Sequence, residues 1–422
     1  MKLKRTSGII LPKTHTLFNN IIRDLDRTLV GFNNEVIKVK FYKKIDDDKI
    51  LIPRFYKLID ENYIDDITSD GEDIEIRSNI IPRNERQKKV IDYLLNHKSG
   101  VIKLEPGSGK TVMSIAAISE LKKKAIIFVH KNSLRNQWAE QIIEFTNLEE
   151  DDIGFLSTKT YEEDFKKRIV IATVQAFCAL LKNEKIALED ELKKANFGVA
   201  FFDETHTTVG PEQFSKASLT LPCKRVFGLS ATPTRADGCD DIIFDHLGEI
   251  FYVPPEKDEL LKPKVFMVQF PFKIYSAHKK YCNWGGRFNP GKYYQQMYKS
   301  SHYNSTIAKM TLKLYNQDRN ILILGVRKKA LLELAKSLNL PKTEIGIFIP
   351  GTNSKERLSV SDTDDLQIAF NEKRIVFSTY NACRDGNNRK SLDTLIMSCP
   401  TGNIEQAIGR IQRTLKGKKI PF

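Results

Sequence analysis

Residues 105–111, Glu-Pro-Gly-Ser-Gly-Lys-Thr, carry the strongest chemical signal in the chain. They lie between an apolar run at 101–104 and a helix-like run at 112–118. A phosphate-binding loop typically connects a strand to a helix in this order. The glycines let backbone N–H groups turn toward phosphates, the lysine neutralises β and γ oxygens, and the threonine offers a hydroxyl to Mg²⁺. Leu104 replaces the first glycine of the general pattern, so a glycine turn that binds nothing is the alternative. The residues expected to bind ATP here are Pro106, Gly107, Ser108, Gly109, Lys110 and Thr111, with Lys110 also catalytic.

An acidic pair, Asp203 and Glu204, follows the apolar run at 199–202. A carboxylate at the carboxyl end of a parallel strand, beside a phosphate-binding loop, is placed to hold a metal ion. We therefore expect Asp203 and Thr111 to hold Mg²⁺, and Glu204 to orient and deprotonate the attacking water. Adjacent acids are also common on solvated surfaces, but the place of this pair after a buried run, downstream of the loop, favours the catalytic interpretation.

Two arginines near the end of the chain, Arg410 and Arg413, share a helical face with Gln406 if residues 406–413 form a helix. Two guanidinium groups on one face can reach a phosphoryl group in transfer, where such a contact contributes about 10³-fold or more in rate. The alternative is an exposed basic helix. We expect both arginines to be catalytic and Gln406 to contact ATP.

These residues need elements that bring them together, and the apolar pattern supplies them. Apolar runs at 125–129, 169–172, 199–202 and 226–229 alternate with helical stretches, which indicates a parallel sheet in an α/β domain. A second series has runs at 320–324, 374–377 and 394–397. We predict an N-terminal accessory domain at 1–80, a first lobe at 81–262, a linker at 263–317 and a second lobe at 318–422.

The linker has an unusual composition, because residues 271–317 contain no Asp or Glu. Its cations alternate with aromatic residues, a mixture suited to binding phosphates and stacking on the bases of a nucleic-acid strand. Arg287 and Lys292 are candidate contacts of this kind. A packed connector whose aromatic side chains belong to the core is an equally good interpretation.

The whole chain has 422 residues, is 41% hydrophobic and carries a formal charge of +14. This composition predicts a folded multidomain protein with a polyanionic partner. No stretch approaches the roughly 20 apolar residues of a membrane span, so an intracellular location is expected: cytoplasmic, or the nucleus or a viral replication site. The six cysteines are scattered without zinc-site spacing, so we expect them to be reduced and mostly buried.

Together with Ser230-Ala231-Thr232, these segments resemble the ordered motifs of superfamily-two helicases over residues 83–413. The resemblance implies an α/β fold of two tandem RecA-like P-loop lobes with parallel sheets, plus a small α+β N-terminal domain, and ATP and Mg²⁺ as cofactors. It implies that Gln87 reads adenine and that Gly386, after the segment 377–380, contacts ATP, although Asn387-Asn388 stand where relatives usually have an aspartate. It also implies coupling roles for His206, Ser230 and Thr232, and nucleic-acid contacts for Lys131, Thr173, Gln175 and Thr379.

Within the superfamily, residues 129–138 and 51–56 are similar to a branch with phage branch-migration helicases, the poxvirus transcript-release helicase and the xeroderma-pigmentosum-B type. The resemblance implies an ATP-dependent helicase or translocase acting on duplex, branched or single-stranded DNA, with RNA less expected. ATP is expected to bind between the lobes.

Two other functions stay open: a polymerase-displacing or transcript-releasing translocase without strand separation, and a catalytically inactive nucleic-acid-binding module. We expect a monomer that can join a replication, repair or transcription assembly. The resemblance implies that residues 1–80 engage DNA or select the substrate, and a structural cap on the first lobe is the alternative. The chain ends soon after the arginine pattern, where relatives continue, so a second lobe shortened at its C-terminus is expected.

Overall fold

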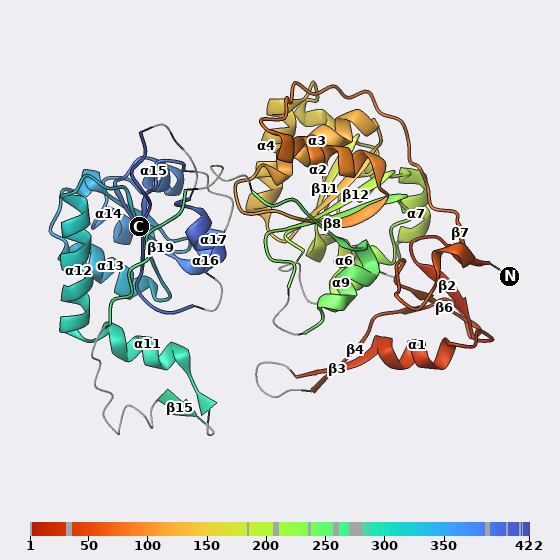
Figure 1. Ribbon diagram of the computed structural model, residues 1–422, viewed down its shortest axis with the longest axis horizontal. Helices are drawn as coiled ribbons and strands as arrows, with labels where there is room; N and C mark the ends of the chain where they lie inside the picture. The colour runs from red at the N-terminus through yellow and green to blue at the C-terminus, as the bar shows by residue number, and fades with distance from the viewer. Residues whose placement is uncertain are drawn as a thin grey trace. The chain divides into compact units, whose positions relative to one another are not determined.

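The computed structural model describes residues 2–30, 36–183, 185–205, 211–234, 238–255, 261–269, 282–284, 287–384, 389–401, 404–412, 415 and 417–422. The chain divides into two compact units, Met1–Pro254 and Pro255–Phe422. Each unit contains a parallel sheet flanked by helices, and the first unit also carries a small N-terminal domain (Figure 1). The α/β fold predicted from the apolar runs is confirmed.

The first lobe is the part of the first unit that is built on a seven-stranded parallel sheet. Its strands follow the order β10-β11-β9-β12-β13-β8-β14, and every pairing is parallel. The strands are β8 (Ser99–Lys103), β9 (Ala125–Val129), β10 (Ile153–Phe155), β11 (Ile169–Thr173), β12 (Val199–Asp203), β13 (Arg225–Ser230) and β14 (Ile250–Tyr252). The helices are α2 (Glu85–Asn96), α3 (Lys110–Leu121), α4 (Asn132–Phe145), α5 (Tyr161–Asp164), α6 (Val174–Leu181), α7 (Leu188–Ala195), α8 (Pro211–Ser218) and α9 (Asp240–Leu247).

Two hydrophobic cores cover the two faces of this sheet. Successive strand side chains point to opposite faces, so Ile127 packs with helices α2, α3 and α4 while its neighbour Ile126 packs with α6 to α9. Figure 1 shows these two groups of helices on opposite sides of the sheet. Strands that are buried on both faces explain why the sequence has apolar runs here rather than an alternating pattern.

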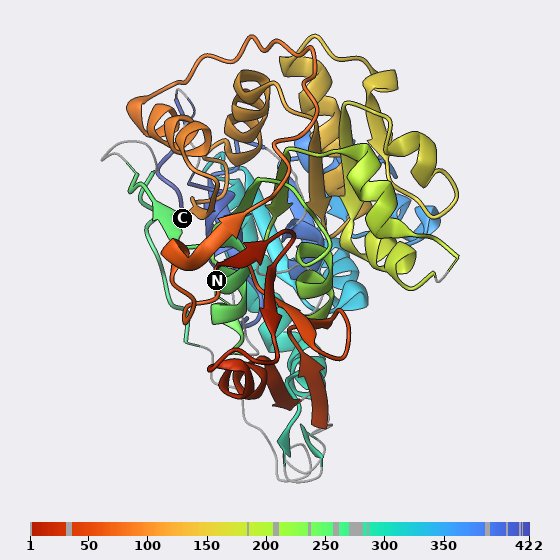
Figure 2. The same ribbon diagram turned by 90° about the vertical axis from the view of Figure 1, so that its right-hand side faces the viewer.

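The N-terminal domain is a mainly antiparallel five-stranded sheet in the order β5-β6-β2-β1-β7. Helix α1 buries Ile21 and Leu25 against it, and β3 and β4 form a separate hairpin after α1 (Figures 1 and 2, red). The elements are β1 (Leu3–Arg5), β2 (Ile9–Pro12), α1 (Phe18–Leu25), β3 (Asp26–Val30), β4 (Val36–Lys40), β5 (Lys43–Lys44), β6 (Lys49–Ile52) and β7 (Ile64–Asp66). This arrangement agrees with the small α+β domain that was expected.

Arg54 joins the N-terminal domain to the first lobe. Its side chain is 1% exposed, and its two terminal nitrogens donate to the carbonyls of Leu221 (2.7 Å) and Cys223 (2.8 Å). Arg5 Nε donates to the Arg54 carbonyl at 3.0 Å. Burial lowers the pKa of Arg54 to about 10. A buried guanidinium is tolerated only where acceptors replace water, so these carbonyls fix the domain in place.

A second contact between the two domains involves carboxylates of α9. Arg27 pairs with Asp241 through two hydrogen bonds, of 2.8 and 2.5 Å. One turn later, the Asp245 carbonyl accepts from Phe55 N–H at 2.8 Å. Burial, followed by the charge of Asp241, raises the pKa of the Asp245 carboxyl to about 7, although Lys57 opposes this shift. The junction therefore contains an acid that holds its proton near neutral pH.

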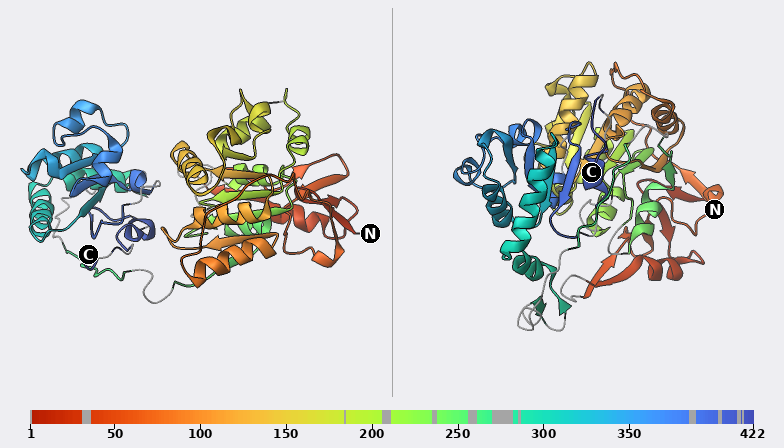
Figure 3. Two further views of the ribbon diagram at one scale, coloured as in Figure 1. Left: turned by 90° about the horizontal axis from the view of Figure 1, so that it is seen from above. Right: turned by 60° about the vertical axis from the view of Figure 1, so that its left-hand side comes forward.

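The second unit has a four-stranded parallel sheet in the order β18-β19-β17-β20 (Figures 1 and 3). Its strands are β17 (Ile321–Gly325), β18 (Ile345–Phe348), β19 (Ile375–Thr379) and β20 (Thr394–Met397), with a short pair β15 (Asn283–Trp284) and β16 (Arg287–Phe288). Its helices are α11 (Pro290–Tyr298), α12 (Ser301–Tyr315), α13 (Lys328–Ser337), α14 (Ser354–Leu358), α15 (Leu366–Asn371), α16 (Tyr380–Arg384) and α17 (Glu405–Gly409).

The described aromatic residues of the acid-free segment belong largely to this core. Tyr298 and Tyr303 are buried, and their hydroxyls reach the side chain and the carbonyl of Ser398. Tyr294 OH donates to the Pro400 carbonyl at 2.9 Å. For α11 and α12 these contacts favour the packed connector over the nucleic-acid surface. The domain boundaries drawn from the sequence stay a prediction.

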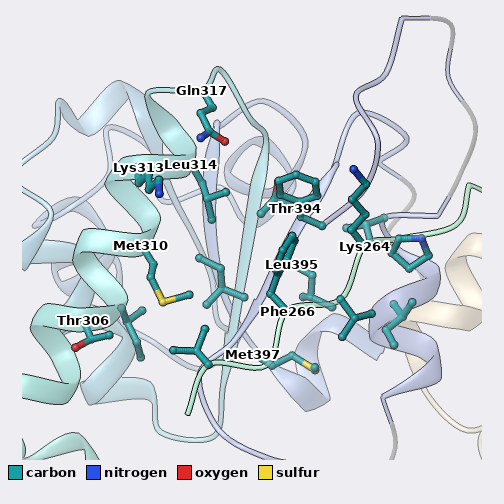
Figure 4. Close-up of a pocket in the computed structure, with 18 of the residues that line it drawn as sticks. Lys264, Phe266, Thr306, Met310, Lys313, Leu314, Gln317, Thr394, Leu395 and Met397 are labelled. Atoms are coloured by element: carbon teal, nitrogen blue, oxygen red, sulfur yellow. The ribbon is translucent and has the colours of Figure 1, made fainter. Parts of the chain in front are cut away.

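A cavity of about 550 Å³ lies within the second unit, between the extended segment 263–268, α12, β20 and α17. Phe266, Met310, Leu314, Leu395 and Met397 line it (Figure 4). Its lining is mainly apolar and includes none of the residues with predicted chemistry.

All six cysteines are buried, as the sequence predicted, and none of them is joined to another by a disulfide. Across the described residues, no helix combines the length and the apolar character needed to cross a membrane.

Replacing Arg54 with leucine should weaken the junction between the N-terminal domain and the first lobe. Two buried carbonyls would lose their donor, so we expect the free energy of unfolding to fall by roughly 2–4 kcal/mol. Urea denaturation measures this change, and limited proteolysis should release the N-terminal domain earlier than in the parent protein. Arg23→Leu, the same change on the exposed side of α1, should stay within about 0.5 kcal/mol of the parent. Equal losses in the two variants would refute the role of Arg54.

Asp245 should make stability depend on pH. Its folded pKa of about 7 lies above the ordinary value of 3.8, so between about pH 4 and pH 7 the folded protein binds more protons than the unfolded chain. The free energy of unfolding should therefore fall as pH rises through this window and stay lower above it. Asp245→Asn should remove this contribution and lose less stability between pH 5 and pH 8. Thermal melting across this range measures it, with exposed Asp92→Asn as the control that should keep the parental slope.

Candidate functional site

The glycine-rich loop connects β8 to α3 in the manner expected of a phosphate-binding loop. Strand β8 ends at Lys103 and α3 begins at Lys110. Gly107 and Gly109 have φ of +82° and +93°, in the left-handed region that favours glycine. Gly109 is the N-cap of α3, so the loop leads directly to a helix N-terminus, where free N–H groups and the helix dipole favour an anion.

The side chains of the loop are hydrogen-bonded to its own backbone. Lys110 Nζ donates to the carbonyls of Leu104 (3.1 Å) and Glu105 (3.4 Å). Ser108 Oγ also donates to the Glu105 carbonyl, at 2.8 Å. Lys110 thus bends back across the loop rather than away from it, which keeps its ammonium group where a bound phosphate would lie.

Gln87 contacts the same loop from α2. Asn84 caps this helix by accepting from Gln87 N–H at 2.9 Å. The Gln87 amide then donates to the Ser108 carbonyl at 3.0 Å and accepts from Arg83 N–H at 2.9 Å. A Cβ at Gly109 would lie 2.9 Å from Gln87 Nε2. The expected adenine-reading residue is therefore beside the phosphate loop, and the lack of a side chain at Gly109 leaves room for this approach.

Arg86 is a supporting residue to which the sequence assigned no role. Its guanidinium is buried, pairs with Glu105 at the start of the loop and donates to the Val253 carbonyl at 2.7 Å. Tyr252 OH donates to the same Glu105 carboxylate at 3.3 Å. These contacts tie the loop to α2 and β14. The only signal in the sequence was the Arg-Gln pair itself, because the partners lie far away along the chain.

Strand β13 connects the phosphate loop to the acidic pair. It lies between β8 and β12 in the sheet. Its Ser230 carbonyl accepts from Leu104 N–H at 3.1 Å, and its Leu229 carbonyl accepts from Thr205 N–H at 3.2 Å. Ser230 Oγ accepts from Thr232 N–H at 3.1 Å. Strand β13, at whose end the Ser-Ala-Thr segment begins, is thus hydrogen-bonded to the segments on both sides of it, and the coupling role of Ser230 and Thr232 stays a prediction.

Asp203 ends β12 as a buried carboxylate. Burial and the neighbouring charge of Glu204 raise its pKa, while a hydrogen bond from Trp138 and the positive charge of Lys110 act in the opposite direction. The electrostatic effect of Lys110 means that the loop and the acidic pair lie within reach of each other. A second cation would offset the remaining cost of burying this charge.

The oxygen donors at this edge suit Mg²⁺. Asp203 offers a carboxylate and Thr111, in the first turn of α3, offers a hydroxyl. The described residues hold no cluster of three or more His, Cys, Asp or Glu side chains that would form a dedicated metal cage. Mg²⁺ commonly uses one or two protein oxygens and takes its other ligands from phosphates and water, so the chemistry of these two donors suits the ion, and their role as its ligands stays a prediction.

Lys131, Thr173 and Gln175 lie farther along the same edge, after β9 and β11. Thr173 Oγ1 accepts from Ala176 N–H at 3.2 Å and caps α6. The Gln175 amide is exposed and donates to the His130 carbonyl at 3.3 Å. Lys131 is the N-cap residue of α4. The three residues are adjacent to one another, and their contact with nucleic acid stays a prediction.

In the second unit, Thr379 ends β19, and its hydroxyl accepts from Ala382 N–H at 3.3 Å. Helix α17 ends at Gly409, with Arg410 as its C-cap. The helix expected over 406–413 is therefore shorter, which agrees with the low helix propensity of glycine. Arg410 is buried and Lys292 lies in α11. His206, Gly386 and Arg413 lie outside the described residues, as do the side chains of Gln406 and Arg287.

Glu204 has a strained backbone, with φ of +50°. An L residue there costs roughly 1–2 kcal/mol. Glu204→Gly and Glu204→Ala both remove the carboxylate, but only alanine keeps the Cβ that disfavours a positive φ. We therefore expect the glycine variant to be more stable than the alanine variant by about 1 kcal/mol. At exposed Glu140 in α4, the order should reverse by about the same amount. Urea denaturation of the four variants tests this, and alanine being the more stable at both positions would disprove the strain.

Comparisons with known proteins agree with this geometry. Residues 80–235 match the family model described as type III restriction enzyme, res subunit. A protein of Acanthamoeba polyphaga mimivirus, named as an ATP-dependent RNA helicase, is 27% identical over 77% of this chain and 59% of its own length. The DNA 3'-5' helicase XPB of Kineococcus radiotolerans is 30% identical over 41% of this chain and 30% of its own length. This chain thus spans less than two thirds of the length of these relatives.

A solved structure supports the fold. The ATP-dependent Type ISP restriction-modification enzyme LlaBIII bound to DNA aligns with 81% of this chain and 27% of its own chain, with a TM-score of 0.53 and 14% identity. The match to the family model covers the phosphate loop, the acidic pair and the Ser-Ala-Thr segment. Residues 80–235 therefore resemble the res subunit of type III restriction enzymes, and the chain is similar to helicases of superfamily two over most of its length.

Proposed function

We propose that this chain is an ATP-dependent motor that moves on, or remodels, duplex or branched DNA. The observation that carries the proposal is the shared edge of the first-lobe sheet, where the charge of Lys110 acts on Asp203 and β13 contacts both segments. A phosphate loop beside a buried carboxylate and a second acid provides the groups that nucleotide hydrolysis requires.

Each residue has a role in this mechanism. The N–H groups of the loop and Lys110 bind the β and γ phosphates, and Gln87 recognises the adenine. Thr111 and Asp203 hold Mg²⁺, which neutralises phosphate charge when it is bound. Glu204 orients the attacking water and accepts its proton. Arg410 and Arg413 stabilise the charge that develops on the transferring group, while Gln406 and Gly386 complete the contacts with ATP.

Hydrolysis is coupled to movement through the edge of the sheet. Ser230, Thr232 and His206 respond to the state of the nucleotide, because β13 is hydrogen-bonded to the segments on both sides of it. Lys131, Thr173, Gln175 and Thr379 hold the nucleic-acid backbone, with Arg287 and Lys292 as further cations. Contacts with phosphates position a protein without reading sequence, so the motor should act with little sequence preference.

DNA is the proposed substrate, although the relatives differ in their names. The mimivirus relative is named as an RNA helicase, whereas the XPB relative is named as a DNA helicase and LlaBIII is bound to DNA. The charge of +14 suits either polymer. We favour DNA because the segments 129–138 and 51–56 are most similar to the DNA-acting branch. A monomer that joins a replication, repair or transcription assembly is the proposed working form.

ATP hydrolysis should be stimulated by DNA and abolished in the catalytic variants. We expect duplex or four-way junction DNA to raise the rate at least about tenfold over no nucleic acid. Lys110→Ala removes a charge that binds the phosphates, and Glu204→Gln removes the base, so each should lose more than about 10²-fold in rate. Glu204→Gln should still bind ATP, because it removes only the base. Exposed Lys122→Ala, at the other end of α3, is the matched control and should keep the parental rate.

Each other outcome of this assay would point to a different function. Stronger stimulation by RNA than by any DNA would replace the proposed substrate. Stimulation by duplex DNA without release of a displaced strand would favour a polymerase-displacing or transcript-releasing translocase. Hydrolysis that is absent with every nucleic acid, together with retained DNA binding, would leave an inactive binding module.

A further inference from the structure

Trp138 connects the core of the first lobe to the acidic pair. It lies in the middle of α4, it is 1% exposed, and it belongs to the core between the sheet and helices α2 to α4. Its indole Nε1–H donates to Asp203 Oδ2 at 2.8 Å. Asp203 is itself only 6% exposed. One of the two oxygens of the carboxylate therefore has its partner fixed by a core side chain.

This contact decides how the Asp203 carboxylate is oriented. The last torsion of an aspartate side chain is broad, with no single preferred angle, so a carboxylate alone at the end of a strand can rotate. A charge-assisted hydrogen bond from a rigid, packed ring selects one orientation. Donors that hold a metal-binding side chain in this way typically affect metal affinity or activity by 10–100-fold.

We propose that Trp138 is a positioning residue that holds the Asp203 carboxylate in the orientation that binds the Mg²⁺ of Mg²⁺-ATP. This inference rests on the proposed function, since it assigns the metal to Asp203. Trp138 does not touch the nucleotide; it acts through Asp203 alone.

A purely structural role predicts different behaviour. If Trp138 only fills the core, its substitution by phenylalanine reduces stability and affects nucleotide binding equally with and without the metal. If it orients the carboxylate, the same substitution changes the metal-dependent part of binding. Phenylalanine keeps an aromatic ring and removes the N–H donor, so Trp138→Phe separates the two roles. The second tryptophan, Trp284, allows the same chemical change in the other unit as a matched control.

The first measurement is nucleotide binding without nucleic acid, by calorimetry, in EDTA and across a series of Mg²⁺ concentrations. For Trp138→Phe we expect ATP affinity in EDTA to stay within about twofold of the parent protein. The Mg²⁺ concentration that gives half of the metal-dependent gain in affinity should rise by about 10–100-fold. Trp284→Phe should match the parent in both respects. Thermal melting of each variant shows whether it is folded.

The second measurement follows the fluorescence of Trp138, which donates the hydrogen bond to Asp203, in protein that keeps this tryptophan. In Trp284→Phe protein, Trp138 is the one remaining tryptophan, so its fluorescence reports on the Asp203 contact. We expect ATP with Mg²⁺ to change the emission, because the charge of the acceptor carboxylate becomes shared with the metal. ATP in EDTA should leave the emission close to that of the free protein.

The outcomes separate this proposal from the one on which it rests. Parent protein that binds no ATP in the presence of Mg²⁺ would remove the proposed function and this inference together. Metal-dependent binding that is the same in the parent and in Trp138→Phe would overturn only the role of Trp138. Should Trp138→Phe fail to fold, the fluorescence decides: a response to Mg²⁺-ATP beyond that to ATP in EDTA supports the proposal, and equal responses overturn it.

Discussion

The site depends on the hydrogen-bonded order of three strands, β12, β13 and β8. Adjacent strands lie about 4.8 Å apart, so the segments that follow β8 and β12 begin roughly 10 Å from each other, with the end of β13 between them. This spacing leaves little room for side chains. A Cβ at Gly228 would lie 2.7 Å from the side chains of both Leu247 and Thr205. Because Gly228 has no side chain, α9 and the acidic segment can both pack closely against β13 at this position.

The close packing allows the site to hold groups that are unfavourable by themselves. Asp203 is a buried carboxylate whose ionisation is opposed by burial and by Glu204, and Glu204 adopts a left-handed backbone conformation. Neither would persist on a flexible loop. Asp203 is the last residue of a strand that is buried at every residue, and Glu204 follows it directly. The Trp138 indole comes from a helix packed against the same sheet. Packing of the hydrophobic core therefore holds the buried Asp203 carboxylate and the strained Glu204 backbone in place at this end of the sheet.

The sequence predicted the parts of the fold that depend on local pattern. Strands β9 and β20 coincide with their predicted apolar runs. Strand β9 is buried at every residue, and a strand buried on both faces needs such a run. The phosphate loop was found because its glycines are close together in the chain. Contacts between distant residues left no such signal. Arg54 and Trp138 have partners 167 and 65 positions away, and nothing in their own neighbourhood indicates burial. Tyr298 and Tyr303 illustrate the reverse case, since aromatic residues among lysines have the same composition whether they stack on bases or fill a core.

The N-terminal domain is attached to the elements that support the phosphate loop. Arg54 binds the carbonyls of Leu221 and Cys223, just before β13 begins, and Arg27 pairs with Asp241 on α9, which packs against β8 and β13. A force on this domain would therefore act first on β13, the strand that is hydrogen-bonded to the segments next to it that hold the phosphate loop and the acidic pair. Since buried hydrogen bonds are costly to break without replacement, the domain and β13 should move as one body, and whatever the domain binds is mechanically linked to the nucleotide site.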